Sequence, residues 1–290
     1  MRNEQEMLEL ILETATSDDR IRAVIMNGSR VNPNATRDIF QDFDIVYIVT
    51  DVDAFRENPE WIKCFGELIM MQMPEDMHDP PPSNSDGFSY LMLFTDGNRI
   101  DLWLHPVAKL KAIGRDSLSR LLLDKDGIIE PFAAPSESDY LPKPPTAKSF
   151  SDCCNEFWWV STYVAKGLWR EEITYAKHMH DHTVRAQLMK MLIWQIGVKT
   201  EFSRNPGSQG KYFQRYLEPE LWNMLLKTYS DANLDKTWES LFTTCRLFRS
   251  AALTVAEHFG FDYPHDDDQR VTAHLKRVRL LPSDAKSIVD

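Results

Sequence analysis

The chain reads Ile21-Arg-Ala-Val-Ile-Met-Asn-Gly-Ser-Arg30 and, twelve residues after Arg30, Asp42-Phe-Asp-Ile-Val-Tyr-Ile-Val-Thr50. β-Branched and aromatic residues dominate both segments, so we expect strands over Ile21–Met26 and Phe43–Thr50. The second strand is apolar apart from Asp44, which indicates burial on both faces. Gly28-Ser29 ends the first strand, because glycine accepts backbone angles that other residues avoid. The first half of the chain is therefore predicted to contain a buried sheet.

The rest of the first half alternates between helical and strand patterns. Met7, Leu8, Ile11 and Leu12 recur at helical spacing and predict an amphipathic helix through about residue 16. Asp96-Gly-Asn98 is a hairpin signal, because Asp-Gly accepts the positive φ angles of such turns. The remaining expected elements are a short helix at 61–66, a strand at 68–73, a proline-rich loop at 78–87 and hairpin strands at 88–95 and 99–105.

Proline is dense from Pro131 to Pro145, and the apolar periodicity lapses there. We therefore place a linker in this segment and a domain boundary near residue 145. Helix-length patterns dominate beyond it and predict a helical bundle. These helices are expected over residues 151–168, 171–200, 210–217, 219–229 and 234–259, and the acidic run Asp266-Asp-Asp268 is interpreted as a solvated loop. The expected fold is α+β: a mixed sheet with flanking helices over residues 1–145, and a helical bundle over residues 146–290.

Composition and charge narrow the class of protein. The chain has 290 residues and a formal net charge of −11, so we expect no nucleic-acid partner and an attraction to cationic molecules. No stretch approaches twenty uninterrupted apolar residues, and the N-terminus lacks the pattern of a signal peptide. We therefore expect no membrane association, a cytoplasmic location, and a monomer or weak homodimer. Four cysteines without C-x-x-C spacing predict neither a disulfide framework nor a zinc site.

Three aspartates carry the chemical signal of the first half. Asp42 and Asp44 are two residues apart on a strand, so their side chains point to the same face. Asp101 is the only acidic residue in the apolar segment Ile100-Asp-Leu-Trp-Leu104. Unpaired carboxylates are costly to bury, and Mg2+ is the cation that such hard oxygen ligands suit. If the two strands are neighbours, three carboxylates converge beside Gly28-Ser29, as in two-metal phosphoryl-transfer sites.

The order Gly-Ser, Asp-x-Asp and a later strand aspartate resembles the polymerase-beta-like nucleotidyltransferase superfamily. The chain also resembles, from Met1 to about Pro264, the aminoglycoside 6-adenylyltransferase (streptomycin adenylyltransferase) family. The segments that carry this closer resemblance are Phe40-Gln-Asp-Phe-Asp-Ile45, Met70-Met-Gln-Met-Pro-Glu-Asp-Met77, Phe88-Ser-Tyr-Leu-Met-Leu-Phe94, Asp124-Lys-Asp126, Asp152-Cys-Cys-Asn-Glu-Phe-Trp158, Tyr163-Val-Ala-Lys-Gly167 and Gly210-Lys211.

The resemblance implies a nucleotidyltransferase-type sheet domain and a helical substrate-binding domain. It implies Mg2+-dependent transfer of AMP from ATP to the 6-hydroxyl of streptomycin, which confers antibiotic resistance. Gly28, Ser29 and Arg30 would then hold the triphosphate, and Asp42 and Asp44 would bind metal. Asp101 would complete the metal site or accept the proton of the attacking hydroxyl, and a base from the helical half is an equal alternative.

Further carboxylates are candidates for binding the cationic acceptor, because a carboxylate can bind a guanidinium through two hydrogen bonds. They are Glu75, Asp76, Asp152, Glu156 and Asp181. Lys211 follows a glycine-rich turn and opens an expected helix, where a lysine suits a triphosphate.

Two departures from the family pattern bear on the acceptor. Asn27 stands where relatives have glutamate, and Trp103 stands where they have threonine. The alternatives are an adenylyltransferase with a different acceptor, another aminoglycoside or a lincosamide, and a non-catalytic nucleotide-binding regulatory module. The complete set of three aspartates counts against the module.

Overall fold

The computed structural model describes residues 1–77, 79, 87–112 and 116–288. Most of the loop expected at 78–87 lies outside the described residues. The chain divides into two compact units, Met1–Asp139 and Tyr140–Asp290. This division falls in the proline-containing segment, a few residues before the boundary drawn from the sequence.

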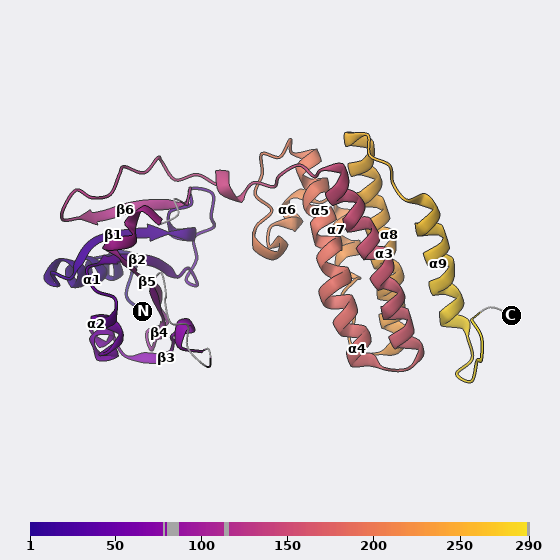
Figure 1. Ribbon diagram of the computed structural model, residues 1–290, viewed down its shortest axis with the longest axis horizontal. Helices are drawn as coiled ribbons and strands as arrows, with labels where there is room; N and C mark the ends of the chain where they lie inside the picture. The colour runs from indigo at the N-terminus through magenta and orange to yellow at the C-terminus, as the bar shows by residue number, and fades with distance from the viewer. Residues whose placement is uncertain (78, 80–86, 113–115, 289–290) are drawn as a thin grey trace. The chain divides into compact units, whose positions relative to one another are not determined.

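The described residues of the first unit form a six-stranded sheet in the order β3-β4-β5-β2-β1-β6 (Figure 1). β2 and β5 run parallel, and the other neighbouring pairs are antiparallel. The strands are β1 (Ile21–Asn27), β2 (Phe43–Val49), β3 (Leu68–Gln72), β4 (Phe88–Phe94), β5 (Arg99–Pro106) and β6 (Ser119–Asp124). The predicted mixed sheet is confirmed, and β6 is a strand that the sequence patterns did not indicate.

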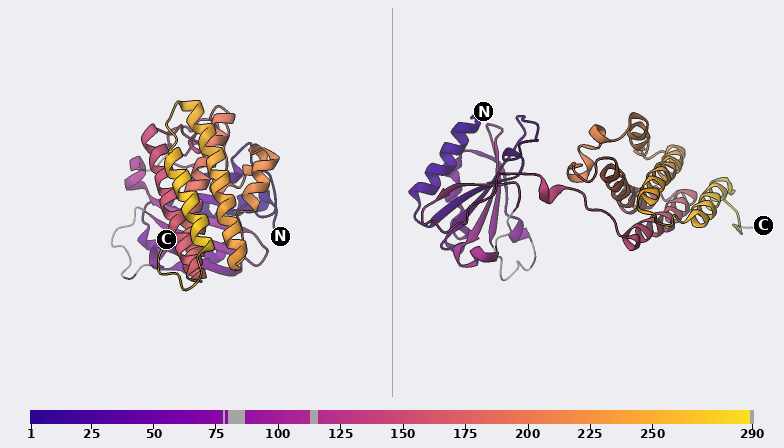
Figure 2. Two further views of the ribbon diagram at one scale, coloured as in Figure 1. Left: turned by 90° about the vertical axis from the view of Figure 1, so that its right-hand side faces the viewer. Right: turned by 90° about the horizontal axis from the view of Figure 1, so that it is seen from above.

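Helices cover one face of this sheet. α1 (Glu4–Ser17), α2 (Asp53–Arg56) and a 3-10 helix (Pro59–Phe65) pack onto the face formed by residues such as Phe43, Ile45 and Tyr47. Figure 2 shows α1 lying along that face in the right-hand view. The 3-10 helix corresponds to the short helix expected at 61–66. Alternate β2 residues face the other way, where Val46 and Ile48 join a smaller apolar cluster. Asp44 lies on this same face, because side chains alternate along a strand.

The second unit is helical, as predicted. Its elements are α3 (Ala147–Trp169), α4 (Ile173–His178), a π-helical turn (Met179–Val184), α5 (Arg185–Lys199), α6 (Phe213–Tyr216), α7 (Pro219–Leu226), α8 (Leu234–Phe259) and α9 (His265–Leu280). The Thr146 and Ser149 side chains each accept a hydrogen bond from the other residue's backbone N–H and so cap the start of α3. No helix among the described residues is both long and apolar enough to span a membrane.

Two expectations for this unit were wrong. The acidic run is not a loop, because Asp266, Asp267 and Asp268 form the first turn of α9. Carboxylates are favourable there, since the first helical turn presents unpaired N–H groups. Residues 210–217 do not form one helix either. A 3-10 turn at Ser208–Gly210 is followed only by the four-residue α6, so Lys211 does not open a long helix.

Candidate active site

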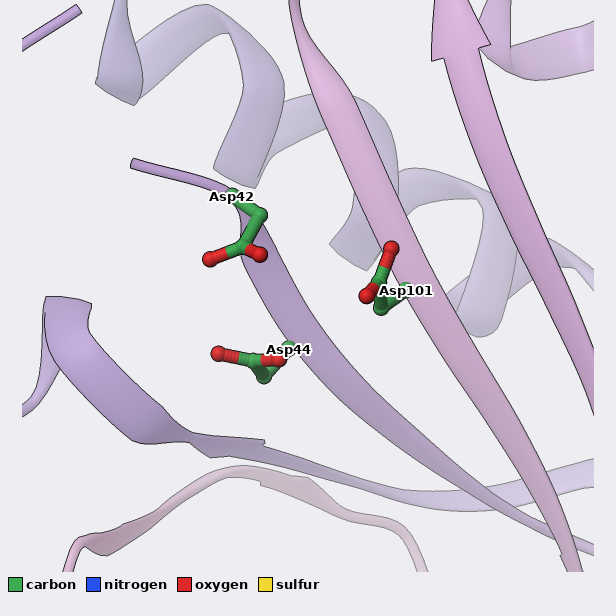
Figure 3. Close-up of side chains that lie close together, drawn as sticks. All are labelled: Asp42, Asp44 and Asp101. Carbon is green, nitrogen blue, oxygen red and sulfur yellow. The ribbon is translucent and has the colours of Figure 1, made fainter. Parts of the chain in front are cut away.

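The parallel pairing of β2 with β5 brings the three aspartates together. Asp44 lies opposite Asp101 on one side and opposite Asn27 of β1 on the other. Asp42 immediately precedes β2, two residues before Asp44, so the two side chains share a face. Figure 3 shows all three carboxylates beside one another: Asp42 from just before β2, Asp44 from β2 and Asp101 from β5. This acidic triad lies on the sheet face opposite α1.

The geometry and electrostatics of the triad fit a divalent cation. One carboxylate oxygen from each of Asp42, Asp44 and Asp101 lies within 4.8 Å of the others. Burial, followed by the negative charges of Asp42 and Asp101, raises the pKa of Asp44 to about 7 from 3.8. The positive charges of Arg99 and Arg30 act in the opposite direction. The three crowded carboxylates form a set of hard oxygen ligands whose mutual repulsion a bound Mg2+ would relieve.

Gly28 allows the turn after β1 to approach the triad. Its φ is +75°, and a Cβ built on it would lie 2.0 Å from Asp44 Oδ2. Any side chain here would therefore collide with the carboxylate as well as strain the backbone. Ser29 follows in the same 3-10 turn, and its hydroxyl accepts a 3.3 Å hydrogen bond from Gln41 Nε2. The turn keeps a short, unobstructed backbone next to Asp44, as close approach to a phosphate requires.

Arg30 is fixed in the structure by the segment that leads into β2. Its Nε donates to the Asp42 carbonyl at 2.8 Å, and its Nη2 donates to the Gln41 carbonyl at 2.6 Å. The guanidinium also lies 3.6 Å from the Phe43 ring centroid, and the residue is only 8% exposed. Arg30 therefore positions the backbone of Asp42. A direct contact between Arg30 and phosphate stays a prediction.

Arg99 is a site residue that the sequence reasoning missed. Its Nε donates to Asp101 Oδ1 at 2.7 Å, and its Nη2 donates to Asp101 Oδ2 at 2.6 Å. The signal was present in the sequence, since Arg99 and Asp101 are two residues apart on one strand and must share a face. Asn27 was noted only as a departure from the family pattern. It pairs with Asp44 across the β1–β2 ladder, and its Oδ1 accepts a 2.8 Å hydrogen bond from Ser119 Oγ.

The two acceptor-binding candidates of the first unit lie on different faces of the sheet. Glu75 accepts hydrogen bonds from the backbone N and the Oγ of Ser89, both at 2.9 Å. Ser89 pairs with Trp103, so alternation along the strands places both residues on the face of the triad. Asp76 instead pairs with Arg56, whose guanidinium lies over Phe88, a core residue of the α1 face. The structure thus brings Glu75, and not Asp76, to the face of the triad.

The candidates of the second unit have varied surroundings. Asp152 is exposed on α3 and pairs with Lys148 at 2.7 Å, and Glu156 is exposed one turn further on. Asp181 lies in the π-helical turn and contacts Lys177 at 2.9 Å and Arg185 at 3.2 Å. Burial acts in the opposite direction, but the neighbouring His180, Lys177 and Arg185 side chains hold the pKa of Asp181 well below its usual range.

Lys211 is exposed, with its Nζ 5.2 Å from the Tyr212 ring centroid. The four-residue α6 begins only at Phe213, so the helix N-terminus that was expected to support a phosphate site at Lys211 is not formed. Its nucleotide-binding role therefore stays a prediction, and one without that structural support.

Comparisons with known proteins identify the family of the chain. Residues 1–278 match the family described as streptomycin adenylyltransferase. The chain is 44% identical over 280 residues to an aminoglycoside 6-adenylyltransferase of Bacillus subtilis (strain 168), covering 96% of this chain and 98% of the relative. Relatives with the same name from Campylobacter jejuni and Staphylococcus aureus are 43% and 38% identical, over 93% and 91% of this chain and 93% and 95% of their own lengths.

A crystal structure of an aminoglycoside 6-adenyltransferase from Bacillus subtilis also matches, with 40% identity, a TM-score of 0.48, and coverage of 97% of this chain and 100% of that one. The family match spans almost the entire chain, and the curated relatives are matched over nearly their full lengths. The chain therefore belongs to the streptomycin adenylyltransferase family and is a nucleotidyltransferase.

Proposed function

We propose that this enzyme transfers AMP from ATP to a hydroxyl of an aminoglycoside, specifically the 6-hydroxyl of streptomycin, in a Mg2+-dependent reaction that confers resistance. The observation that carries the proposal is the acidic triad, with oxygens of Asp42, Asp44 and Asp101 within 4.8 Å of one another. The acceptor rests on the family description, which names streptomycin, and on relatives named aminoglycoside 6-adenylyltransferases.

The triad would hold the metal through one or more oxygens of each carboxylate. Mg2+ bound there supplies positive charge to the phosphates and to the pyrophosphate that leaves. The Gly28 turn would bring backbone N–H groups and the Ser29 hydroxyl to the triphosphate. In the reaction a bond forms between the acceptor oxygen and the α-phosphorus, while the bond to pyrophosphate breaks. The proton of the acceptor hydroxyl goes to a carboxylate, for which Asp101 is one candidate.

Carboxylates would select a cationic acceptor by pairing with its guanidinium groups. Glu75 is our first choice, because it shares the sheet face of the triad and its carboxylate is oriented by Ser89. Asp152 and Glu156 are further candidates, since they are exposed and one turn apart on α3. Asp181 would have to give up contacts with Lys177 and Arg185 before it could bind an acceptor.

Pyrophosphate release in the presence of ATP, Mg2+ and a panel of aminoglycosides tests the proposal. We expect release with streptomycin, and an adenylylated product whose phosphorus couples to the proton at position 6 in NMR spectra. Release with kanamycin or spectinomycin but not with streptomycin would overturn the acceptor.

The same assay tests the metal site through Asp42→Asn, which removes one proposed ligand. We expect release to fall by at least about a thousandfold, on the scale of losing a group essential to transition-state stabilisation. Asp126→Asn is the matched control, since Asp126 is an exposed carboxylate just beyond β6 that pairs with Arg22. Full activity in Asp42→Asn would overturn the mechanism.

A further inference from the structure

Arg99 forms an ion pair with the carboxylate of Asp101. A metal that binds this carboxylate would have to displace the Arg99 guanidinium. The guanidinium donates to both oxygens of Asp101, at 2.7 Å and 2.6 Å. One oxygen of this carboxylate belongs to the ligand set of the acidic triad. A two-pronged arginine–carboxylate pair is the strongest common form of ion pair, so Arg99 and a divalent cation compete for one group.

Arg99 also differs from Arg30, the other arginine of the site, in how firmly it is held. The Arg99 side chain is 49% exposed, whereas that of Arg30 is 9% exposed. Arg30 is tied to two backbone carbonyls, while among the described residues Asp101 is the one hydrogen-bond partner recorded for the Arg99 side chain. Displacement from Asp101 would therefore leave Arg99 in solvent on a flexible stem, still close to the triad.

We propose that Arg99 is an exchangeable counter-ion: it neutralises Asp101 in the metal-free enzyme and binds the leaving pyrophosphate once metal takes Asp101. This inference rests on the proposed function. The freed guanidinium matches phosphate oxygens as well as it matches a carboxylate. Pyrophosphate gains negative charge as it leaves, so a cation beside it favours the reaction.

The proposal predicts effects of opposite sign from one substitution. In Arg99→Gln, Mn2+ no longer competes with the guanidinium, so its binding without nucleotide should tighten about 3- to 10-fold. Pyrophosphate binding in the presence of Mg2+ should weaken roughly 10- to 100-fold, because a charged hydrogen-bond donor is lost. Arg99→Lys keeps the positive charge but lacks the paired N–H donors of the guanidinium. Its affinities for Mn2+ and for pyrophosphate should therefore lie between those of wild type and Arg99→Gln.

Paramagnetic resonance of free Mn2+ measures the first effect, and calorimetry with pyrophosphate and Mg2+ measures the second, both on the full-length protein. Arg22→Gln is the matched control, because Arg22 forms a similar two-pronged pair with Asp126 elsewhere on the sheet. It should change neither affinity.

The proposal is overturned if Mn2+ binding in Arg99→Gln is unchanged or weaker, or if pyrophosphate binding is unchanged. Neither measurement needs an aminoglycoside, so an error in the acceptor would leave the result intact. Wild-type protein that binds Mn2+ no better than Asp42→Asn would instead refute the metal site, and the counter-ion role with it.

Discussion

Replacement of Asp44 by asparagine should stabilise the metal-free protein while abolishing activity. The Asp44 carboxylate lies beside Asp42 and Asp101, and its pKa is raised to about 7 from 3.8. At 1.36 kcal/mol for each pKa unit, the difference corresponds to roughly 4 kcal/mol lost from the free energy of unfolding at pH 7 and above. Part of the side chain meets solvent and asparagine is also polar, so we expect Asp44→Asn to recover about 2 kcal/mol.

The pH dependence of this gain follows from the direction of the shift. With a raised pKa, the folded chain keeps the Asp44 proton while the unfolded chain loses it, so stability is lost as pH rises from about 4 towards 7. The advantage of Asp44→Asn over wild type should therefore grow across that range and level off above about pH 7.

Urea unfolding with EDTA present, followed by fluorescence between about pH 5 and 8, measures this difference. Mg2+ added in excess of EDTA should then stabilise the wild type, which keeps all three proposed ligands, more than the variant. Asp126→Asn again serves as the control and should show no such pH-dependent gain. The reasoning is refuted if Asp44→Asn is less stable than wild type at pH 8 in EDTA, or if its advantage does not change with pH.

Three further substitutions test other parts of the structure. Gly28→Ala should lower adenylyl transfer at least about a hundredfold, because the alanine Cβ would lie 2.0 Å from Asp44 Oδ2. Turnover at the wild-type rate would contradict this expectation. Arg30→Lys removes the two separate nitrogens, Nε and Nη2, that donate to the two carbonyls, so kcat should fall about tenfold as the segment carrying Asp42 loosens. A change confined to the KM for ATP would instead favour direct phosphate binding. Asp268→Asn should cost about 3 kcal/mol of unfolding free energy, because it leaves Arg249 without its buried, charged partner. Mn2+ binding should stay unchanged, and a variant as stable as wild type would refute this expectation.

The parts of the fold that could be predicted have strong local signals. β2 stands out because its β-branched and aromatic residues are unbroken except at Asp44, and the Asp-Gly turn indicates the β4–β5 hairpin. β6 escaped prediction because its apolar residues are Leu121, Leu122 and Leu123, and leucine favours helices at least as much as strands. Its place in the sheet comes from pairing with β1, about a hundred residues earlier, which no local pattern encodes.

The candidate site, like the fold, could be predicted from the sequence only where the signal is local. The spacing of Asp42 and Asp44 fixes a shared face, whereas the approach of Asp101 depends on the parallel pairing of β2 with β5. Glu75 and Asp76 are adjacent in the short 3-10 helix Pro74–Met77, which the sequence patterns did not indicate, so the sequence could not tell which of them faces the triad. The burial of Asp268 was missed for a similar reason, because its main partner, Arg249, lies on a different helix.

The proposed metal site is tested most directly by anomalous X-ray diffraction, which locates Mn2+ in crystals soaked in that ion. We expect a peak within about 2.5 Å of carboxylate oxygens from Asp42, Asp44 and Asp101, with the Arg99 guanidinium displaced from Asp101. A metal bound only elsewhere, or a triad that stays free of Mn2+ with Arg99 still on Asp101, would contradict it.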